Sequence, residues 1–223
     1  MGNEIIRIAI DGPAAAGKST VAKLVAENLS FVYVDTGAMY RAFTLKVIQT
    51  NTNINNVEAV SKLLQNTNIE LSYHDEGQKV LLDGKDVTKE IRLHEINQNV
   101  SNVAQIEAVR KAMVHQQQVL ANNKSIVMDG RDIGTHVIPN AEVKIFLVAS
   151  AEERGKRRHN ENVSKGINSN LNEIIREIEE RDQIDYTRKI SPLVKANDAT
   201  EIDTTSLTIE EVVNLILLEV KKI

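Results

Sequence analysis

Short apolar runs alternate along the chain with longer segments of helical spacing. Residues 5–10 have the apolar, β-branched look of a buried parallel strand, and the helically spaced segment 18–29 follows. In 36–49, Tyr40, Phe43 and Val47 fall on one helical stripe. Strands that alternate with helices predict an α/β fold, a parallel sheet covered on both faces. Further strands are predicted at 31–35, 125–129, 143–149 and 200–204, and further helices at 106–121, 151–160, 171–186 and 209–222.

One stretch breaks this rhythm. Residues 69–87 have the pattern of antiparallel strands, with Asp83 and Gly84 suited to a two-residue type I′ turn and Gly77 to a looser one. The Asn-rich residues 49–56 before this stretch and 88–92 after it are predicted to be its connections. The sequence therefore predicts a small antiparallel sheet inserted into the α/β core.

The glycine-rich stretch "DGPAAAGKST" supplies the first candidate chemistry. Gly12, Gly17, Lys18 and Ser19 match the phosphate-binding pattern G-x-x-x-x-G-K-[ST], between a predicted strand and a predicted helix. Backbone N–H groups would bind phosphates, Lys18 would reach the β and γ oxygens, and Ser19 would ligate Mg²⁺. The alternative is a glycine- and alanine-rich turn that matches by chance. The predicted ATP-binding residues are Gly12, Pro13, Ala14, Ala15, Ala16, Gly17, Lys18, Ser19 and Thr20.

Asp129 ends a predicted strand, where proteins with this loop usually place an acidic group near the metal. Ser19 and Asp129 are thus the candidate Mg²⁺ ligands. An ordinary strand-end turn in "DGRD" is the alternative.

Two groups of arginines indicate that the phosphoryl group bound at this loop is transferred to a second molecule. Arg154, Arg157 and Arg158 have i, i+3, i+4 spacing, so a helix would place them on one face, and Arg181, Asp185 and Arg188 form a second stripe. Guanidinium groups stabilise the charge that develops in phosphoryl transfer. The alternative is a solvated face with ion pairs to the interleaved glutamates. The Asp-x-x-Gly motif of GTPases is absent, and Ile126 in "NKSI" stands where an Asp would recognise guanine, which argues against a switch.

The amino-acid composition disfavours several classes of protein. The chain has 223 residues, no cysteine and a formal charge of −4, which disfavours a disulfide framework and a general nucleic-acid binder. Its first residues make a poor signal peptide and too short a run for a membrane span. We therefore expect a cytoplasmic protein that binds neither membrane nor nucleic acid. The five histidines show no short metal-ligand spacing.

The motifs "DGPAAAGKST", "VDTGAMYR", "DGRDIGT" and "ERDQIDYTRKISPLVKA" together resemble the bacterial cytidylate kinases, and the resemblance covers nearly the whole chain. It implies transfer of the γ-phosphoryl group of ATP to CMP or dCMP, with Mg²⁺ as cofactor and a monomeric enzyme. It also implies a five-stranded parallel core with a helical lid. The alternatives are another small-molecule P-loop kinase, or a nucleotide-dependent switch or binding module.

The resemblance also implies site residues and domains. Thr36, Arg110 and Asp132 would meet the cytosine ring, although Asp132 could instead pair with Arg110 or Arg131. Ser101, Arg181 and Asp185 would lie around the sugar, and Arg41, Arg131 and Arg188 near the acceptor phosphate. Tyr40 is the remaining residue implied for the CMP site. The implied catalytic residues are Lys18, Arg131, Arg154, Arg157, Arg158 and Arg188. The implied domains are a discontinuous core (1–62 and 102–223), a monophosphate-binding insert (63–101) and a lid (151–166).

Overall fold

The computed structural model describes residues 5–74 and 77–223. By its internal contacts the chain divides into two compact units. The first unit comprises Met1–Tyr33 and Ala121–Ile223, and the second unit comprises Val34–Leu120. The first unit is therefore built from both ends of the chain. The division into a core, an insert at 63–101 and a lid remains a prediction.

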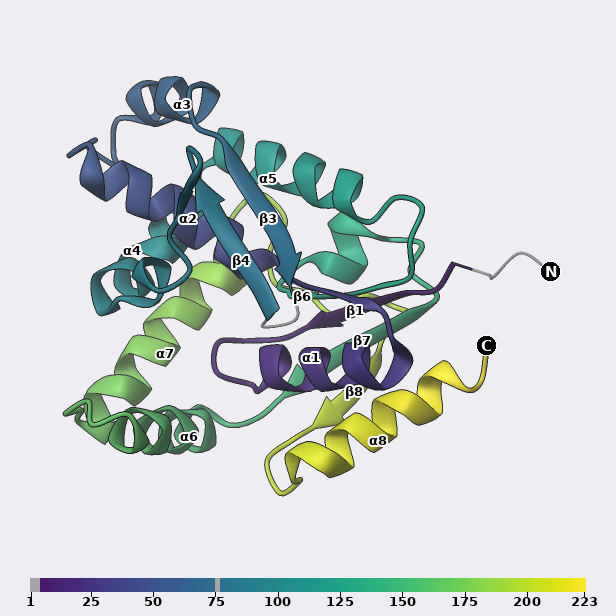
Figure 1. The fold of residues 1–223 in the computed structure, drawn as a ribbon. Coiled ribbons are helices and arrows are strands. Elements are labelled where there is room, and N and C mark those ends of the chain that lie inside the picture. The colour runs from purple at the N-terminus through teal and green to yellow at the C-terminus, as the bar shows by residue number, and fades with distance from the viewer. Residues whose placement is uncertain (1–4, 75–76) are drawn as a thin grey trace. The chain divides into compact units, whose positions relative to one another are not determined.

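The predicted parallel sheet has the strand order β2–β6–β1–β7–β8. Strands β6, β1, β7 and β8 belong to the first unit (Figure 1), and β2 crosses the boundary between Tyr33 and Val34. Central strand β1 pairs in parallel with β6 and β7, and β7 pairs in parallel with β8. Ile8, Ile10 and Leu147 have no solvent exposure, as expected for a sheet covered by helices. The strands are β1 (Arg7–Asp11), β2 (Val32–Asp35), β6 (Ile126–Gly130), β7 (Val143–Val148) and β8 (Thr200–Asp203).

The helices of the first unit follow the sequence prediction closely. Helix α1 occupies the predicted residues, whereas α6 continues beyond the predicted end to Ser164. Arg188 lies one residue beyond the end of α7, so the predicted second stripe leaves the helix at its last member. The helices are α1 (Lys18–Leu29), α6 (Ala151–Ser164), α7 (Leu171–Thr187), α8 (Ile209–Val220) and the short π-helix η2 (Ile133–Val137).

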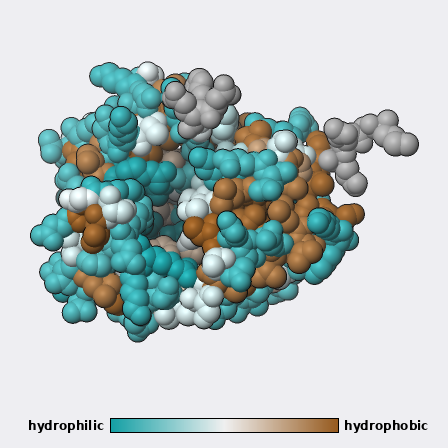
Figure 2. Space-filling view, turned by 60° about the horizontal axis from the view of Figure 1, so that its bottom comes forward, coloured by the Kyte–Doolittle hydropathy of each residue, from teal (hydrophilic) through white to brown (hydrophobic). Residues whose placement is uncertain are grey.

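Helix α8 is apolar around much of its circumference. Val212, Val213 and Ile216 are buried in the core of the first unit, while Leu215 and Leu218 are exposed. Figure 2 shows apolar surface gathered on the side where α8 lies. No helix in the described part of the chain is long and apolar enough to span a membrane.

The second unit contains the predicted antiparallel sheet, in the order β3–β4–β5. Asp83 and Gly84 have φ angles of 50° and 79°, as the predicted type I′ turn requires at both positions. The looser turn predicted near Gly77 falls on residues 75–76, which lie outside the described residues. The strands are β3 (Ile69–His74), β4 (Gly77–Leu82) and β5 (Lys85–Asp86).

Helices surround a separate core in the second unit. Phe43, Ile91, Ile96 and Met113 are almost completely buried there. Two helices, α3 and α4, were not predicted from the sequence. The helices are α2 (Thr36–Gln49), α3 (Val57–Gln65), η1 (Glu90–Arg92), α4 (His94–Ala104) and α5 (Glu107–Leu120).

Candidate active site

The phosphate-binding pattern forms a loop between β1 and α1, as its sequence context predicts. Gly12 has a φ of 147°, and a Cβ there would lie 2.2 Å from the carbonyl oxygen of Leu147 on β7. Gly17, with φ 86°, is the N-cap of α1. Both positions therefore require glycine, the first for space and the second for backbone conformation.

Lys18 is buried inside this loop, and its Nζ donates a hydrogen bond to the Pro13 carbonyl at 2.6 Å. Burial, together with nearby Arg131, lowers the lysine pKa well below its ordinary value, and Asp129 partly opposes this. Anionic oxygens brought to the loop would strengthen the charged form of Lys18, since an opposite charge favours ionisation.

Ser19 and Asp129, the predicted metal ligands, lie in contact. The Ser19 hydroxyl donates to Asp129 Oδ2 at 2.9 Å, and the Tyr33 hydroxyl donates to Oδ1 at the same distance. Among the described residues no cluster of three or more His, Asp or Glu side chains could hold a metal. A hydroxyl and one carboxylate nevertheless fit Mg²⁺, which is usually held by few protein ligands plus substrate phosphates.

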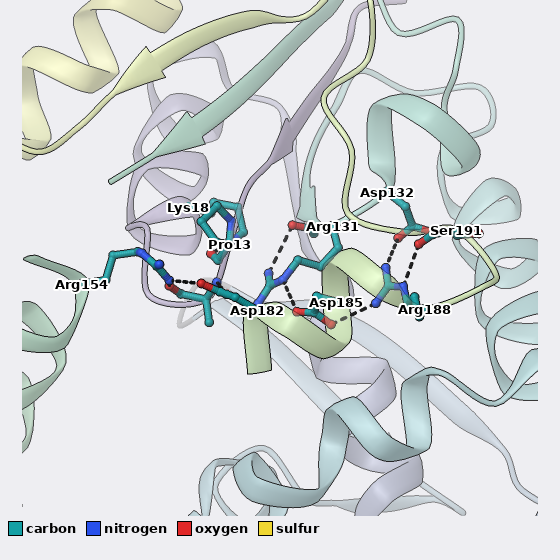
Figure 3. A network of polar contacts seen from close by, with 11 residues as sticks. Pro13, Lys18, Arg131, Asp132, Arg154, Asp182, Asp185, Arg188 and Ser191 are labelled. Atoms are coloured by element: carbon teal, nitrogen blue, oxygen red, sulfur yellow. Dashed lines mark hydrogen bonds and ion pairs between the residues drawn. The ribbon is translucent and has the colours of Figure 1, made fainter. Parts of the chain in front are cut away.

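A network of arginines and carboxylates lies in the same unit (Figure 3). Asp185 accepts hydrogen bonds from Arg131 Nε at 2.9 Å and from Arg188 Nη1 at 3.1 Å. Arg188 also donates to the Ser191 carbonyl at 2.7 Å and lies 4.0 Å from Asp132. Asp185 is thus an ion-pair partner of both Arg131 and Arg188 within the protein.

This network is charged and cationic on balance. Burial raises the pKa of Asp185, but Arg131, Arg181 and Arg188 outweigh it and hold that pKa below its ordinary value. Asp185 in turn outweighs the effect of burial on Arg131 and raises the arginine pKa. Three guanidinium groups around one ionised carboxylate suit an anionic ligand.

The three arginines of α6 do not share one environment. Arg154 is buried and donates to the carbonyls of Ala149 and Ala14, both at 2.9 Å. Arg157 donates to the Thr204 hydroxyl at 3.0 Å and lies 3.4 Å from Glu153. Arg158, by contrast, is half exposed and 3.9 Å from Glu161. The ion pairs of the solvated-face alternative are therefore present for Arg157 and Arg158, and Arg154 points inward.

The second unit holds the other predicted residues. Asp35, the N-cap of α2, pairs through Oδ2 with Arg41 at 2.8 Å and with Arg92 at 2.6 Å. Although burial raises the Asp35 pKa, the two arginines outweigh it and lower that pKa. The Arg41 guanidinium is therefore held against the start of α2.

A second cluster in this unit joins α2, α4 and α5. The guanidinium of Arg110 stacks over the Tyr40 ring at 4.7 Å from its centre, and its Nε donates to the Ala104 carbonyl at 3.0 Å. Thr36 lies one helical turn before Tyr40, and both are buried, as is Ser101 on α4.

Comparison with known proteins decides the family. The sequence model described as "Cytidylate kinase" matches residues 8–222. The chain belongs to the cytidylate kinase family. The cytidylate kinase of Oceanobacillus iheyensis is 57% identical over 217 residues, which are 97% of this chain and 94% of that protein. The cytidylate kinase of Bacillus subtilis is 57% identical over 212 residues, 95% of each chain.

Solved structures agree on the fold at much lower identity. An uncharacterized protein from Eubacterium ventriosum matches 99% of this chain and 100% of its own, with 12% identity and a TM-score of 0.54. A gluconokinase from Sinorhizobium meliloti matches 97% of this chain and 92% of its own, with 13% identity and a TM-score of 0.50. The cytidylate kinase fold is therefore shared with at least one kinase of another name.

Motif matching missed four charged side chains that hold candidate site residues of this cytidylate kinase family member, or the segments next to them, in place within their own unit. They are Asp11, Asp35, Arg92 and Asp182. Asp11 accepts hydrogen bonds from the N–H groups of Ile133 and Gly134 at 2.9 and 2.8 Å. An acidic residue directly before a helix is a recognised N-cap signal, so Asp35 could have been found. The roles of the other three depend on partners far away in sequence.

Proposed function

We propose that the protein transfers the γ-phosphoryl group of ATP to CMP or dCMP, with ADP and CDP or dCDP as products. The observation that carries the proposal is a phosphate-binding loop whose buried Lys18 lies close enough to Arg131 and Arg181 for both to lower its pKa. The loop suits a phosphate donor, and the arginines suit a second anion. The names of relatives that are 57% identical over almost the whole chain support the same activity.

On the donor side, residues 12–20 would bind the triphosphate of ATP. N–H groups of the loop and of the first turn of α1 would bind its oxygens. The Lys18 ammonium would stabilise negative charge on the phosphoryl group in flight, an interaction that strengthens in the transition state. Arg154, Arg157 and Arg158 would act from α6 on the charge that develops during phosphoryl transfer, and Arg158 is the most exposed of the three.

On the acceptor side, Arg41, Arg131 and Arg188 would hold the phosphate of CMP. Ser101, Arg181 and Asp185 would contact the sugar, and Thr36, Tyr40 and Arg110 the base. In the reaction an acceptor oxygen forms a bond to the γ phosphorus while the bond from that phosphorus to the β–γ bridging oxygen breaks. The displaced oxygen remains on ADP, and no covalent enzyme intermediate is needed.

Ser19 and Asp129 would hold Mg²⁺. A bound Mg²⁺ neutralises phosphate charge and orients the two reacting groups. The contact between the two side chains places a hydroxyl and a carboxylate oxygen next to each other at the start of α1. That donor set is what supports the assignment.

Asp132 would discriminate between bases. Its carboxylate can accept a hydrogen bond from the amino group of cytosine, whereas uracil offers a carbonyl at that position. With uracil bound, the buried carboxylate would lack a hydrogen-bond donor and would repel the carbonyl oxygen of the base. Arg188 Nη2 lies 4.0 Å from Asp132 Oδ1 and would help to orient this carboxylate.

A coupled assay for ADP tests the activity. Wild-type protein should release ADP quickly with CMP or dCMP, slowly with UMP, AMP or GMP, and very slowly without an acceptor. Lys18→Ala should remain folded and lose about 10²-fold or more in kcat, because the charge on the transferred group loses its partner. Lys23→Ala, on the exposed side of α1, is the matched control and should behave like wild type.

The same assay separates the alternatives. A different small-molecule P-loop kinase would show no stimulation by CMP or dCMP but would be stimulated by another acceptor. A switch or binding module would hydrolyse ATP at the same low rate with and without acceptors. Monomeric state and cytoplasmic location stay predictions.

A further inference from the structure

The backbone N–H and carbonyl of Ala14, inside the phosphate-binding loop, are bonded by two charged side chains, Asp182 and Arg154, which Figure 3 labels. Asp182 Oδ1 accepts a hydrogen bond from the Ala14 N–H at 3.1 Å. Arg154 Nη1 donates to the Ala14 carbonyl at 2.9 Å. The same Nη1 lies 2.6 Å from Asp182 Oδ2, so the two side chains and the peptide close a ring of contacts, which we name the Ala14 clamp.

The clamp is buried. Ala14, Arg154 and Asp182 are only 4%, 5% and 7% exposed. Two buried charges are costly to desolvate, and removal of one partner strands the other. Arg154 is further fixed because its Nε donates to the Ala149 carbonyl at 2.9 Å, just before α6 begins. The clamp therefore has one well-defined geometry.

The loop needs such support because its backbone is strained next to the clamp. Ala15 has a φ of 58°, a left-handed conformation that costs a residue with a Cβ about 1 to 2 kcal/mol. Strained backbone persists only where the surrounding structure enforces it. The two hydrogen bonds to Ala14, the residue directly before Ala15, are placed to do this.

The clamp also joins the loop to the helices that carry the arginines. Arg154 belongs to α6, and Asp182 belongs to α7. One helical turn after Asp182 on α7, Asp185 holds Arg131 and Arg188. A displacement of Asp182 would move the loop and this network relative to each other.

We propose that Asp182 is a positioning residue for phosphoryl transfer, which acts with Arg154 through the Ala14 peptide and touches neither nucleotide. The expected change in kcat rests on the proposed function, whereas the expected change in the backbone of the loop does not. Preorganised donors are effective because they need no rearrangement at the moment of reaction. A displacement of about 1 Å among positioned groups can cost roughly 10²-fold in rate.

Two variants separate the contributions of Asp182. Asp182→Asn keeps an oxygen that can accept from the Ala14 N–H, but it removes the charge opposite Arg154. Asp182→Ala removes both contacts. We expect kcat to fall about 10-fold in Asp182→Asn and about 100-fold in Asp182→Ala, with KM for CMP changed less than threefold. Glu179→Gln, an exposed carboxylate on the same helix, is the matched control and should retain wild-type kcat.

A double-mutant cycle tests whether Asp182 acts through Arg154. If both belong to one clamp, adding Arg154→Ala to Asp182→Ala should lower kcat by far less than it does in the wild type. Independent contributions that multiply would overturn the clamp. So would a KM for CMP that rises while kcat is unchanged, because it would place Asp182 at the acceptor nucleotide.

A readout without nucleotide keeps this test separate from the proposed function. Amide hydrogen exchange in the free protein should be faster at Ala14 and Ala15 in both Asp182 variants and unchanged in Glu179→Gln. If wild-type protein lacks activity with CMP but the exchange result holds, the proposed function fails and the clamp stands. If exchange at Ala14 stays at the wild-type rate in Asp182→Ala, which removes the acceptor, the clamp fails. Should Asp182→Ala not fold, a wild-type kcat in Asp182→Asn, which loses the charge opposite Arg154, has the same consequence.

Discussion

At the scale of single residues, Asp11 is a buried carboxylate that fixes the backbone next to candidate site residues. It ends β1, and its two oxygens accept the N–H groups of Ile133 and Gly134 at the start of η2. A Cβ on Gly134 would lie 3.4 Å from Asp11 Oδ2 and 3.3 Å from the Lys144 side chain, so the approach is close. Asp11 thereby fixes the segment that directly follows Arg131 and Asp132.

Asp11 should make stability depend on pH. Burial raises its pKa to about 7, against the opposing effect of the two N–H groups. The folded protein therefore holds this proton more tightly than the unfolded chain, and the contribution of Asp11 to stability falls as pH rises from about 4 to about 7. Asp11→Asn cannot titrate, so wild type should lose up to about 1.4 kcal/mol per pH unit relative to it in that range.

Urea unfolding of both proteins at pH 5, 6, 7 and 8 measures this difference. Glu179→Gln controls for the loss of a carboxylate as such. Stability curves of wild type and Asp11→Asn that run parallel across this range would contradict the expected ionisation.

The sequence predicted the local structure of the phosphate-binding loop better than the contacts of the candidate site residues. Gly12, Lys18 and Ser19 could be assigned because the loop is local, and its strand and helix adjoin it. Arg154, Arg157 and Arg158 lie on helix α6, as their i, i+3, i+4 spacing predicted, but the spacing did not predict their different partners. The guanidinium groups of Arg154 and Arg157 are oriented by Ala14 and Thr204, partners from other parts of the chain that helical spacing cannot reveal.

At the scale of elements, the packing of α6 on α7 depends on one glycine. Gly155 is buried, and a Cβ there would lie 2.4 Å from Ile175 Cγ1, which is not the mobile end of that side chain. Within a helix, glycine is otherwise about 1 kcal/mol less favourable than alanine. The close approach of the two helices offsets that cost.

Gly155→Ala should therefore destabilise the protein by about 1 to 2 kcal/mol, because overpacking outweighs the gain in helix propensity. In an Ile175→Ala background the same substitution should become neutral or stabilising, since the obstructing carbon is gone. Urea unfolding of the two single variants and the double variant measures this. Additive effects, or stabilisation by Gly155→Ala alone, would show that the helices can separate freely.

The elements that the sequence failed to predict have a common cause. Helix α4 contains Asn97, Asn99 and Asn102, and asparagine has low helix propensity. Its apolar Ile96 and Val100 are buried in the core of the second unit, so tertiary packing stabilises the helix. Helix α3 was obscured in the same way by the Asn-rich run before it, although Asn56 proved to be its N-cap.

At the scale of the whole molecule, the chain order of the first unit sets it apart from the second. The second unit is one continuous segment, Val34–Leu120. In the first unit, β1 lies between β6 and β7, both of which come after that segment. Pairing β1 therefore closes a loop of more than a hundred residues, whereas the second unit needs only shorter closures.

We therefore expect the second unit to gain protection first during refolding, since local contacts form faster than distant ones. Pulsed hydrogen exchange on the full-length chain should protect amides of α2 and α5 before those of β1. Protection of β1 in the earliest phase would contradict this order.

The same chain order governs synthesis. Gly12 packs against the Leu147 carbonyl, and Asp11 is bonded to Ile133 and Gly134, so the nucleotide loop is completed by residues made long after it. A nascent chain would emerge from the ribosome with this loop exposed and unsupported until β7, and then α6 and α7 with Arg154 and Asp182, follow. We expect ATP affinity to appear abruptly, once translation has passed α7, and not gradually as the chain lengthens.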